Sequence, residues 1–385
     1  MISTDGTVAT RPPSIPTPRL DSLTGLRWWA AFGVFLFHMR IFAPVPVLDA
    51  FAPFGNHGVA FFFVLSGFVL TWSARPGTTV RNFYWRRFAR IYPAHFVALL
   101  LAIPVFYSFA PDPAEWWVKP FSIGILLLSV LLIQGWFSDP AIMFSGNPAA
   151  WTLTVEAFFY ALHPFVLRVL QLLRMRGVAI FLCTVVVASF AQRALTMFFP
   201  SGWWASMPLP VNRLSEFLIG MGIALLLKLG WRPRFGVWLP LALLALFVAG
   251  TVAFSRFGIA PGLLAIGNSF QKEILVVLLA ALILAIALLD LRGGRSWMKA
   301  PWMVKLGEWS FAFYLVHATA MYFVMSIVGA QPRGFGNLIW YPPVFALALL
   351  GAWLLYRFVE HPLELRMRKW GNRKLQPAAP ARSAT

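Results

Sequence analysis

Residues 20–42 read LDSLTGLRWWAAFGVFLFHMRIF, a long apolar run with Arg27 near its start and His38 near its far end. The separation of eleven residues is close to three turns of an α-helix, so both side chains project from one face. An ionisable side chain that faces lipid is costly. The pattern therefore predicts a polar track that runs inward from one membrane surface.

The composition places the chain among membrane proteins. Of its 385 residues, 59% are hydrophobic and only 12% are charged, and apolar runs of membrane-spanning length recur from end to end. Because these runs are continuous rather than alternating, they exclude a porin-like β-barrel. The sequence therefore predicts an all-α, polytopic bundle of transmembrane helices.

The chain is strongly basic, with 32 Lys and Arg against 13 Asp and Glu and a net charge of +19. In a soluble protein this charge would suggest nucleic-acid binding, but in a membrane protein it reflects the excess of Lys and Arg in cytoplasmic connections. We therefore expect membrane lipids, and no nucleic acid, as partners. The lone Cys183 excludes a disulfide within the chain, and no Cys and His spacing typical of a metal site occurs.

Eleven apolar runs are candidates for membrane spans: 26–44, 56–74, 92–110, 121–138, 152–172, 178–199, 211–228, 235–254, 272–291, 306–328 and 339–359. Five clusters of Lys and Arg lie in the connections and near the end of the chain, within 75–90, 168–176, 228–234, 292–305 and 366–374. All five clusters can be cytoplasmic only if one run fails to cross.

Counting membrane crossings from either terminus identifies residues 121–138 as the apolar run that does not cross. We expect this segment to be re-entrant or to lie in the membrane interface, which leaves about ten spans and puts both termini in the cytoplasm. Eleven crossings are the alternative, and they would misplace a basic cluster or separate the termini. The membrane domain is expected over residues 20–365, between a disordered N-terminal segment, 1–19, and a basic disordered tail, 366–385.

His38 and Glu156 are the expected catalytic residues. His38 lies about 16 Å along its helix from Arg27, past the middle of a hydrocarbon core about 30 Å thick. Glu156 lies about one turn below the outer surface, so the two groups can share a depth. A carboxylate beside an imidazole forms an acid–base pair, and buried ionisable residues in spans usually serve function. A structural tie between two helices is the alternative.

Arg86, Arg87 and Arg90 lie at the expected cytoplasmic mouth, in the stretch RRFARIYP. The guanidinium fork matches phosphate oxygens and keeps its charge, so this cluster is suited to an anionic substrate from the cytosol. Topology determination and contact with lipid headgroups are the alternative roles.

Four further residues are candidates for substrate binding: Ser66, Tyr160, His317 and His57. Ser66 and Gly67 form a small-residue notch at which a ligand chain or another helix can approach closely, and helix packing is the alternative role. His317 is a second polar point inside a span. His57 lies near the outer interface, where an acceptor would enter.

The other acidic residues near span ends are given structural roles. Glu360 and Glu364 are expected to end the last span and to pair with basic side chains. Arg213 and Glu216 are three residues apart on one helix face and are expected to form an ion pair.

The chain lacks the sequence signatures of nucleotide loops and of Gly-x-Ser-x-Gly elbows, and its Ser and Cys residues have no obvious activating neighbour. Direct transfer with a His as general base is therefore expected, rather than a Ser or Cys covalent intermediate. A transporter or lipid-handling protein that uses the same polar track is the alternative, although the repeated halves typical of many transporters are not visible.

Taken together, these stretches resemble the acyltransferase 3 family of integral membrane O-acyltransferases. The resemblance covers nearly the whole chain and rests on motifs in family order: Arg27 and His38 within TGLRWWAAFGVFLFH, then GVAFFFVLSGF, RRFARIYP, WTLTVEAFFYALHP, SFAFYLVH and VEHPLE. It implies a similar number of spans, an acyl-CoA donor on the cytoplasmic side and a hydroxyl-bearing acceptor.

The resemblance also implies roles for residues. It makes His38 the catalytic histidine, with Arg27 in support and Glu156 assisting at the reacting centre. The acyl-CoA site would be formed by four arginines, Arg27, Arg86, Arg87 and Arg90. It implies no tightly bound cofactor and no metal, and acetyl-CoA is the expected co-substrate.

Two departures from the family pattern matter. Many members have an Asp three residues before the motif arginine, where this chain has Thr24, and Asp21 is displaced by three. Some members carry a fused extracytoplasmic hydrolase-like domain, for which the tail here is too short.

Stand-alone members acylate sugars, polysaccharide units or macrolide-type natural products, and the Ala-, Pro-, Arg- and Trp-rich composition is typical of a high-GC bacterium. We therefore expect a multi-pass protein of the bacterial inner membrane. The sequence leaves its oligomeric state open, with a homodimer as one option.

Overall fold

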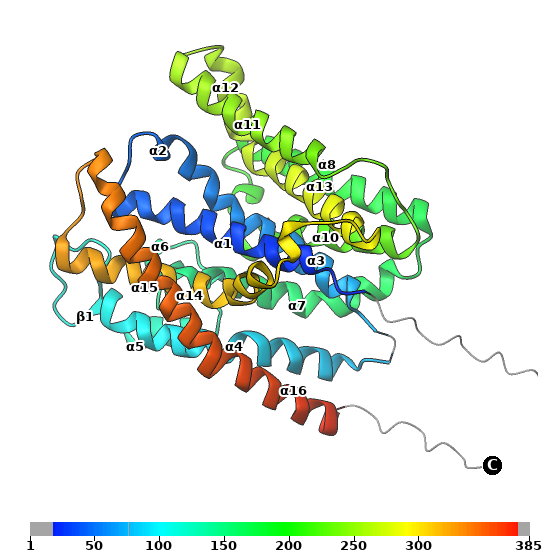
Figure 1. Cartoon of the computed structure of the whole chain (residues 1–385), viewed down its shortest axis with the longest axis horizontal. Coiled ribbons are helices and arrows are strands. Elements are labelled where there is room, and N and C mark those ends of the chain that lie inside the picture. The colour runs from blue at the N-terminus through cyan, green and yellow to red at the C-terminus, as the bar shows by residue number, and fades with distance from the viewer. Residues whose placement is uncertain (1–17, 76, 376–385) are drawn as a thin grey trace, which may run out of the picture.

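The computed structural model describes residues 18–75 and 77–375. Its long helices pack side by side into a bundle (Figure 1). In chain order they are α1 (Asp21–Phe42), α3 (Gly58–Trp72), α4 (Val80–Phe106), α7 (Trp151–Leu170), α8 (Met175–Phe198), α10 (Leu214–Lys228), α11 (Trp238–Phe257), α13 (Gln271–Leu291), α14 (Pro301–Val328), α15 (Tyr341–Leu355) and α16 (His361–Leu375).

Short elements connect the long helices. The short α-helices are α2 (Leu48–Phe51), α5 (Ile123–Val130), α6 (Pro140–Met143), α9 (Leu209–Asn212) and α12 (Pro261–Ser269). The 3₁₀ turns are η1 (Ala52–His57), η2 (Gln134–Trp136), η3 (Pro148–Ala150), η4 (Trp203–Ala205), η5 (Trp297–Lys299) and η6 (Phe335–Trp340), and η7 (Tyr356–Glu360) is a π turn. Two short strands, β1 (Tyr107–Ser108) and β2 (Lys119–Pro120), pair in parallel.

The predicted bundle of membrane-spanning helices is confirmed. Nine helical segments of the described chain are long and apolar enough to cross a membrane. α1 is not among them because polar side chains such as Arg27 and His38 interrupt it. Its 22 residues nevertheless extend over about 33 Å, and it lies within the bundle (Figure 1). With α1 included, each predicted span corresponds to one helix.

The segment 121–138 does not cross the membrane, as the charge pattern predicts. Its helix α5 has eight residues and is therefore about 12 Å long, too short for a hydrocarbon core about 30 Å thick. The segment is held against the bundle by polar contacts, since His95 Nε2 donates to the carbonyl of Ser129 at 3.0 Å and the Ser129 and Ser145 hydroxyls lie 2.6 Å apart. Eleven crossings are thereby excluded.

Glycines allow two pairs of helices to approach very closely. At the crossing of α3 and α10, a Cβ atom on Gly67 would overlap the backbone carbonyl of Phe217, and one on Gly220 would overlap that of Val64. The notch predicted at Ser66 and Gly67 is therefore a packing site on its Gly67 side.

The second close crossing joins α1 to α14. A Cβ atom on Gly307 would overlap the carbonyl of Thr24, and the ring centroids of Trp28 and Phe313 lie 5.0 Å apart beside this crossing. This packing directs the Arg27 and His38 face of α1 toward α14.

The C-terminal end of the chain differs from the prediction. The helix that contains the last predicted span does not end at Glu360, because η7 continues directly into α16, which runs to Leu375. The disordered tail expected over 366–385 is therefore wrong for residues 366–375. Residues 376–385, and residues 1–17 of the expected N-terminal disordered segment, lie outside the described part of the chain.

Aromatic packing explains why a basic, polar stretch forms α16. The rings of Trp85 and Trp370 lie 4.7 Å apart, and Trp85 Nε1 donates to the carbonyl of Met367 at 2.7 Å. Gly371 leaves room for the Trp85 indole. Tertiary contact with α4 thus overrides a composition that is typical of disorder.

The two ends of the described chain lie at one end of the bundle (Figure 1). Arg19, before α1, contacts Glu308 at 3.4 Å, and the hydroxyl of Tyr356 lies 3.5 Å from the same carboxylate. The Thr79 hydroxyl, at the start of α4, donates to the carbonyl of Leu375 at 2.9 Å. This arrangement agrees with the predicted even number of crossings.

The α3–α10 crossing provides a test of the packing. A Gly67→Ala change should lower the free energy of unfolding by about 1–3 kcal/mol, because the added methyl group forces two backbones apart. The measurement is thermal unfolding of the purified protein in detergent. Gly250→Ala on α11 is the matched control, since its added Cβ meets nothing within 4 Å. Equal unfolding temperatures for the two variants would contradict this account.

Candidate active site

A cavity of about 200 Å³ lies between α1, α3, α4, α7 and α14. Six of the predicted site residues line it: Arg27, Ser66, Arg87, Arg90, Glu156 and Tyr160. Most of the remaining wall is apolar and includes Val59, Phe62 and Phe311, and Tyr314 adds a polar group. Residues from five helices, far apart in the sequence, therefore meet around one chamber, which we call the inner cavity.

A second, wider cavity of about 530 Å³ lies next to it, around the start of α4. Its basic lining residues are Arg75, Arg86, Arg87, Arg168 and Lys228, and its described lining contains no Asp or Glu. Arg87 lines both spaces, so the inner cavity and this basic vestibule meet at one guanidinium. Arg75, Arg168 and Lys228 belong to three separate basic clusters assigned to topology, and their separation along the chain does not indicate that they share a cavity.

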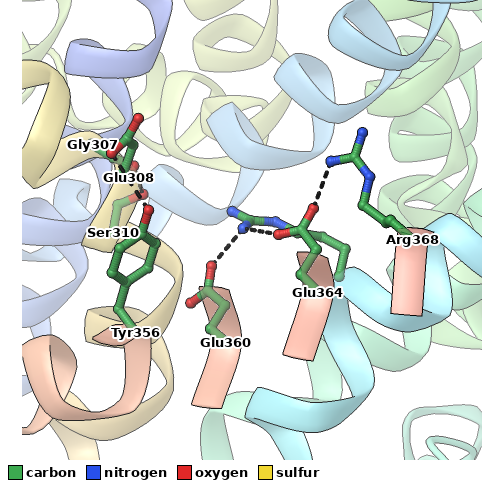
Figure 2. Close-up of polar contacts among 8 residues, drawn as sticks. Gly307, Glu308, Ser310, Tyr356, Glu360, Glu364 and Arg368 are labelled. Carbon is green, nitrogen blue, oxygen red and sulfur yellow. Dashed lines mark hydrogen bonds and ion pairs between the residues drawn. The ribbon is translucent and has the colours of Figure 1, made fainter. Parts of the chain in front are cut away.

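The three arginines of the RRFARIYP stretch have different partners. Arg90 contacts Glu360 at 2.6 Å and Glu364 at 2.9 Å. Figure 2 shows Glu360 and Glu364 on one side of the same helix, with Arg368 on the far side of Glu364, which it contacts at 3.0 Å. The predicted pairing of Glu360 and Glu364 with basic residues is confirmed. The charge of Arg90 is accordingly neutralised.

Arg86 and Arg87 are not neutralised in this way. Arg86 donates to the side-chain oxygen of Asn372 at 2.9 Å, which is a neutral partner. Arg87 forms no ion pair within the described chain, and its Nε is buried without a hydrogen-bond acceptor. Its guanidinium carbon lies 6.0 Å from the ring centroids of both Phe83 and Tyr160. Arg87 therefore presents an uncompensated positive charge where the two cavities meet.

Glu156 and His38 do not pair in the structure. Glu156 instead accepts a hydrogen bond of 2.8 Å from the Tyr160 hydroxyl. Glu156 and Tyr160 both line the inner cavity, whereas His38 does not. Their helices direct the two groups to different neighbours.

His38 lies beside His317. The Nδ1 atom of His38 is 3.2 Å from Nε2 of His317 and 2.9 Å from the carbonyl oxygen of Val34. The Nδ1 atom of His317 is 2.7 Å from the carbonyl oxygen of Tyr314, and His317 has no exposed surface. Two residues assigned separately from the sequence therefore form one pair. The signal available was that both histidines lie in mid-span.

Tyr314 lies between the inner cavity and the histidine pair. Its side chain lines the cavity, and its ring centroid is 5.6 Å from that of His317. Its hydroxyl donates to the carbonyl of Ala149 at 3.2 Å, which fixes the ring against η3. The sequence alone does not distinguish this residue, because a tyrosine inside an apolar span has an ordinary packing role.

The remaining predicted groups lie elsewhere. His57 lines a separate, mostly apolar cavity of about 250 Å³ beside α13, so the structure does not bring it together with His38. Arg213 and Glu216 form the predicted ion pair, at 2.8 Å. Over residues 18–75 and 77–375 no three His, Cys, Asp or Glu side chains are grouped closely enough to hold a metal ion.

Comparison with known proteins places the chain among membrane acyltransferases. The sequence model of the family described as "Acyltransferase domain" matches residues 20–357. Acyltransferase MdmB of Streptomyces mycarofaciens is 33% identical over 392 aligned residues, which cover 94% of this chain and 95% of the relative. No solved structure shows a significant match.

Two further relatives match less of the chain. Nodulation protein 10 of Rhizobium leguminosarum is 25% identical over 304 residues, covering 71% of this chain and 74% of the relative. Peptidoglycan O-acetyltransferase OatA of Listeria monocytogenes is 27% identical over 164 residues, covering 39% of this chain and 24% of the relative. The family match spans most of the chain and includes the inner cavity and the histidine pair, so the protein belongs to the acyltransferase 3 family of membrane acyltransferases.

Proposed function

We propose that the protein transfers an acyl group from acyl-CoA to a hydroxyl group of a sugar, a polysaccharide unit or a natural product such as a macrolide. The observation that carries this proposal is the meeting of a basic vestibule and a largely apolar inner cavity at Arg87. A donor with a phosphate-rich head and a neutral, thioester-bearing arm has the matching distribution of charge.

The vestibule is proposed to hold the phosphate groups of acyl-CoA. Its cations, among them Arg75, Arg86 and Arg168, surround a space whose described lining offers no competing carboxylate. Arginine binds phosphate oxygens in a bidentate manner and keeps its charge. Arg90 has two carboxylate partners and is proposed to organise the site rather than to bind phosphate directly.

The inner cavity is proposed to receive the pantetheine arm and a short acyl group. Its volume of about 200 Å³ is below the range of about 300–1,000 Å³ typical of complete ligand pockets, so it suits part of a donor whose head lies outside. This size favours acetyl-CoA. The relative OatA is named a peptidoglycan O-acetyltransferase, which points to the same acyl group.

Acyl transfer is proposed to use His38 as general base. The acceptor hydroxyl oxygen attacks the thioester carbonyl carbon, the C–S bond breaks, and the proton passes by way of His38 to the departing CoA thiolate. Arg27 lies on the inner cavity and forms no ion pair within the described residues. It can therefore stabilise negative charge on the thioester oxygen. Because Tyr314 separates the cavity from His38, the reaction requires the Tyr314 side chain to move.

Glu156 and Tyr160 are proposed to contact the substrates rather than to orient His38. Their hydrogen bond of 2.8 Å holds a carboxylate and a phenol against the same cavity as Ser66. These groups can bind the amide groups of the pantetheine arm. The role of Glu156 therefore differs from the one expected from its depth alone.

The end of the bundle that carries the basic vestibule is proposed to face the cytoplasm of a bacterial cell. Acyl-CoA is a cytosolic metabolite, and the excess of Lys and Arg in the connections at this end agrees with the positive-inside rule. Both termini would then be cytoplasmic and the protein would lie in the inner membrane. The acceptor is proposed to approach from the opposite end.

Replacing His38 tests the proposed chemistry. His38→Ala should lower kcat by about 100-fold or more, because the general base is removed. The measurement is release of CoA from acetyl-CoA by protein in nanodiscs. The acceptor panel is a macrolide lactone with free hydroxyls, a methyl glycoside and an N-acetylated disaccharide, and mass spectrometry confirms the acylated product. His361→Gln on α16, an exposed position away from both cavities, is the matched control. Full activity of His38→Ala, or CoA release that never depends on an acceptor, would reject the proposal.

Replacing Arg87 tests the donor site. Arg87→Gln should raise the KM for acetyl-CoA by about 10- to 100-fold, since a charge-assisted contact contributes about 1.5–3 kcal/mol, and should leave the KM for the acceptor nearly unchanged. Arg81→Gln, an exposed arginine on the same helix that lines neither cavity, controls for the loss of positive charge. A larger change in acceptor KM than in donor KM would count against the assignment.

A further inference from the structure

One member of the histidine pair, His317, has no role in the proposed reaction. His317 is fully buried and does not line either the inner cavity or the vestibule. Direct contact with a substrate, the role expected from the sequence, therefore has no support from its surroundings. Its ring nevertheless lies 3.2 Å from the Nδ1 atom of the proposed general base.

Backbone carbonyls determine which ring nitrogens carry protons. A carbonyl oxygen can only accept, so Nδ1 of His317, at 2.7 Å from the Tyr314 oxygen, must be protonated. A neutral ring then has a lone pair on Nε2, which faces His38. Nδ1 of His38 also lies close to a carbonyl oxygen, that of Val34 at 2.9 Å, and must be protonated too. Its single N–H is therefore shared between the Val34 oxygen and the lone pair on Nε2 of His317.

This arrangement determines the protonation state of the other ring nitrogen of His38, Nε2. Since Nδ1 of His38 carries the proton, its Nε2 atom has the lone pair needed to accept the proton of an acceptor hydroxyl. We propose that His317 is the positioning residue of the reaction: it shares the Nδ1–H of His38 with the Val34 carbonyl and so helps to hold the base in the tautomer and orientation that expose Nε2. This inference rests on the proposed function.

In many enzymes a carboxylate performs this task for a catalytic histidine. Here the acidic candidates do not reach His38, because Asp21 lies about 25 Å away along α1 and Glu156 accepts from Tyr160. A neutral imidazole avoids the large cost of desolvating a carboxylate inside the membrane. When His38 takes up a proton on Nε2, its Nδ1–H remains bonded to the lone pair of His317, and His317 remains anchored to the Tyr314 carbonyl.

The helical turn that carries His317 is itself fixed from outside. Asn147 Nδ2 donates to the carbonyl of Leu315 at 2.7 Å. This contact attaches the turn of α14 that carries His317 to the η3 region, and it does not involve the Tyr314 side chain. The backbone that positions the His317 ring can therefore stay in place when Tyr314 moves.

Two substitutions distinguish a positioning role from a structural one. His317→Leu removes the acceptor and should lower kcat by about 100-fold or more, with little change in the KM of acetyl-CoA. His317→Gln supplies an amide oxygen for His38 and an amide NH₂ for the Tyr314 carbonyl, and should retain kcat within about tenfold of the wild type. The assay is acetyl-CoA with whichever acceptor of the panel gives turnover, and the unfolding temperature of each variant is measured alongside.

Three kinetic outcomes would overturn the inference: wild-type kcat in His317→Leu, equally low kcat in folded Leu and Gln variants, or a change confined to the KM of the acceptor. A wild-type protein that shows no acyl transfer would instead overturn the proposed function, and this inference with it.

A second measurement does not depend on a folded variant of His317. In wild-type protein labelled with ¹⁵N-histidine, the ring shifts of His38, assigned by their loss in His38→Ala, should show a protonated Nδ1 and an unprotonated Nε2. A protonated Nε2 with a bare Nδ1 would overturn the inference even if His317→Leu fails to fold.

Discussion

The close approach of α1 and α14 is the constraint on which the rest of the site depends. At this crossing the Gly307 Cα faces the Thr24 carbonyl without an intervening side chain. The short distance allows His38 and His317, on opposite helices, to reach hydrogen-bond distance. The same face of α1 carries Arg27 into the inner cavity beside Tyr314. A larger residue at the crossing would separate the base from its partner and displace an arginine from the chamber.

The arrangement of charge follows a simple pattern. Where arginine is needed for architecture, as at Arg90, carboxylates from η7 and α16 neutralise it. Where the two cavities meet, Arg87 is left without an ion pair among the described residues and is flanked by aromatic rings. Burying an uncompensated cation is costly, so the fold retains this charge at the expense of its own stability. Such a site is expected where an anionic ligand supplies the missing partner.

Much of this architecture could be predicted from the sequence, because hydropathy and length determine which segments cross. Charge in the connections correctly singled out 121–138 as the segment that does not. Six of the residues singled out from motifs do share the inner cavity. Depth along a helix, however, says nothing about the neighbour that a side chain meets. Glu156 and His38 are predicted at comparable depths and yet face Tyr160 and His317. Similarly, the composition of residues 366–375 could not reveal that Trp370 packs on Trp85.

The pairing of Arg90 with Glu360 and Glu364 has a practical consequence for protein engineering. Glu360 lies in η7 and Glu364 in the first turn of α16, and they neutralise a guanidinium on the wall of the reaction chamber. A truncation that removes either acid would therefore strip a counter-charge from the interior, even though the deleted segment looks dispensable in the sequence. Affinity tags and reporter fusions should accordingly be attached beyond the end of α16.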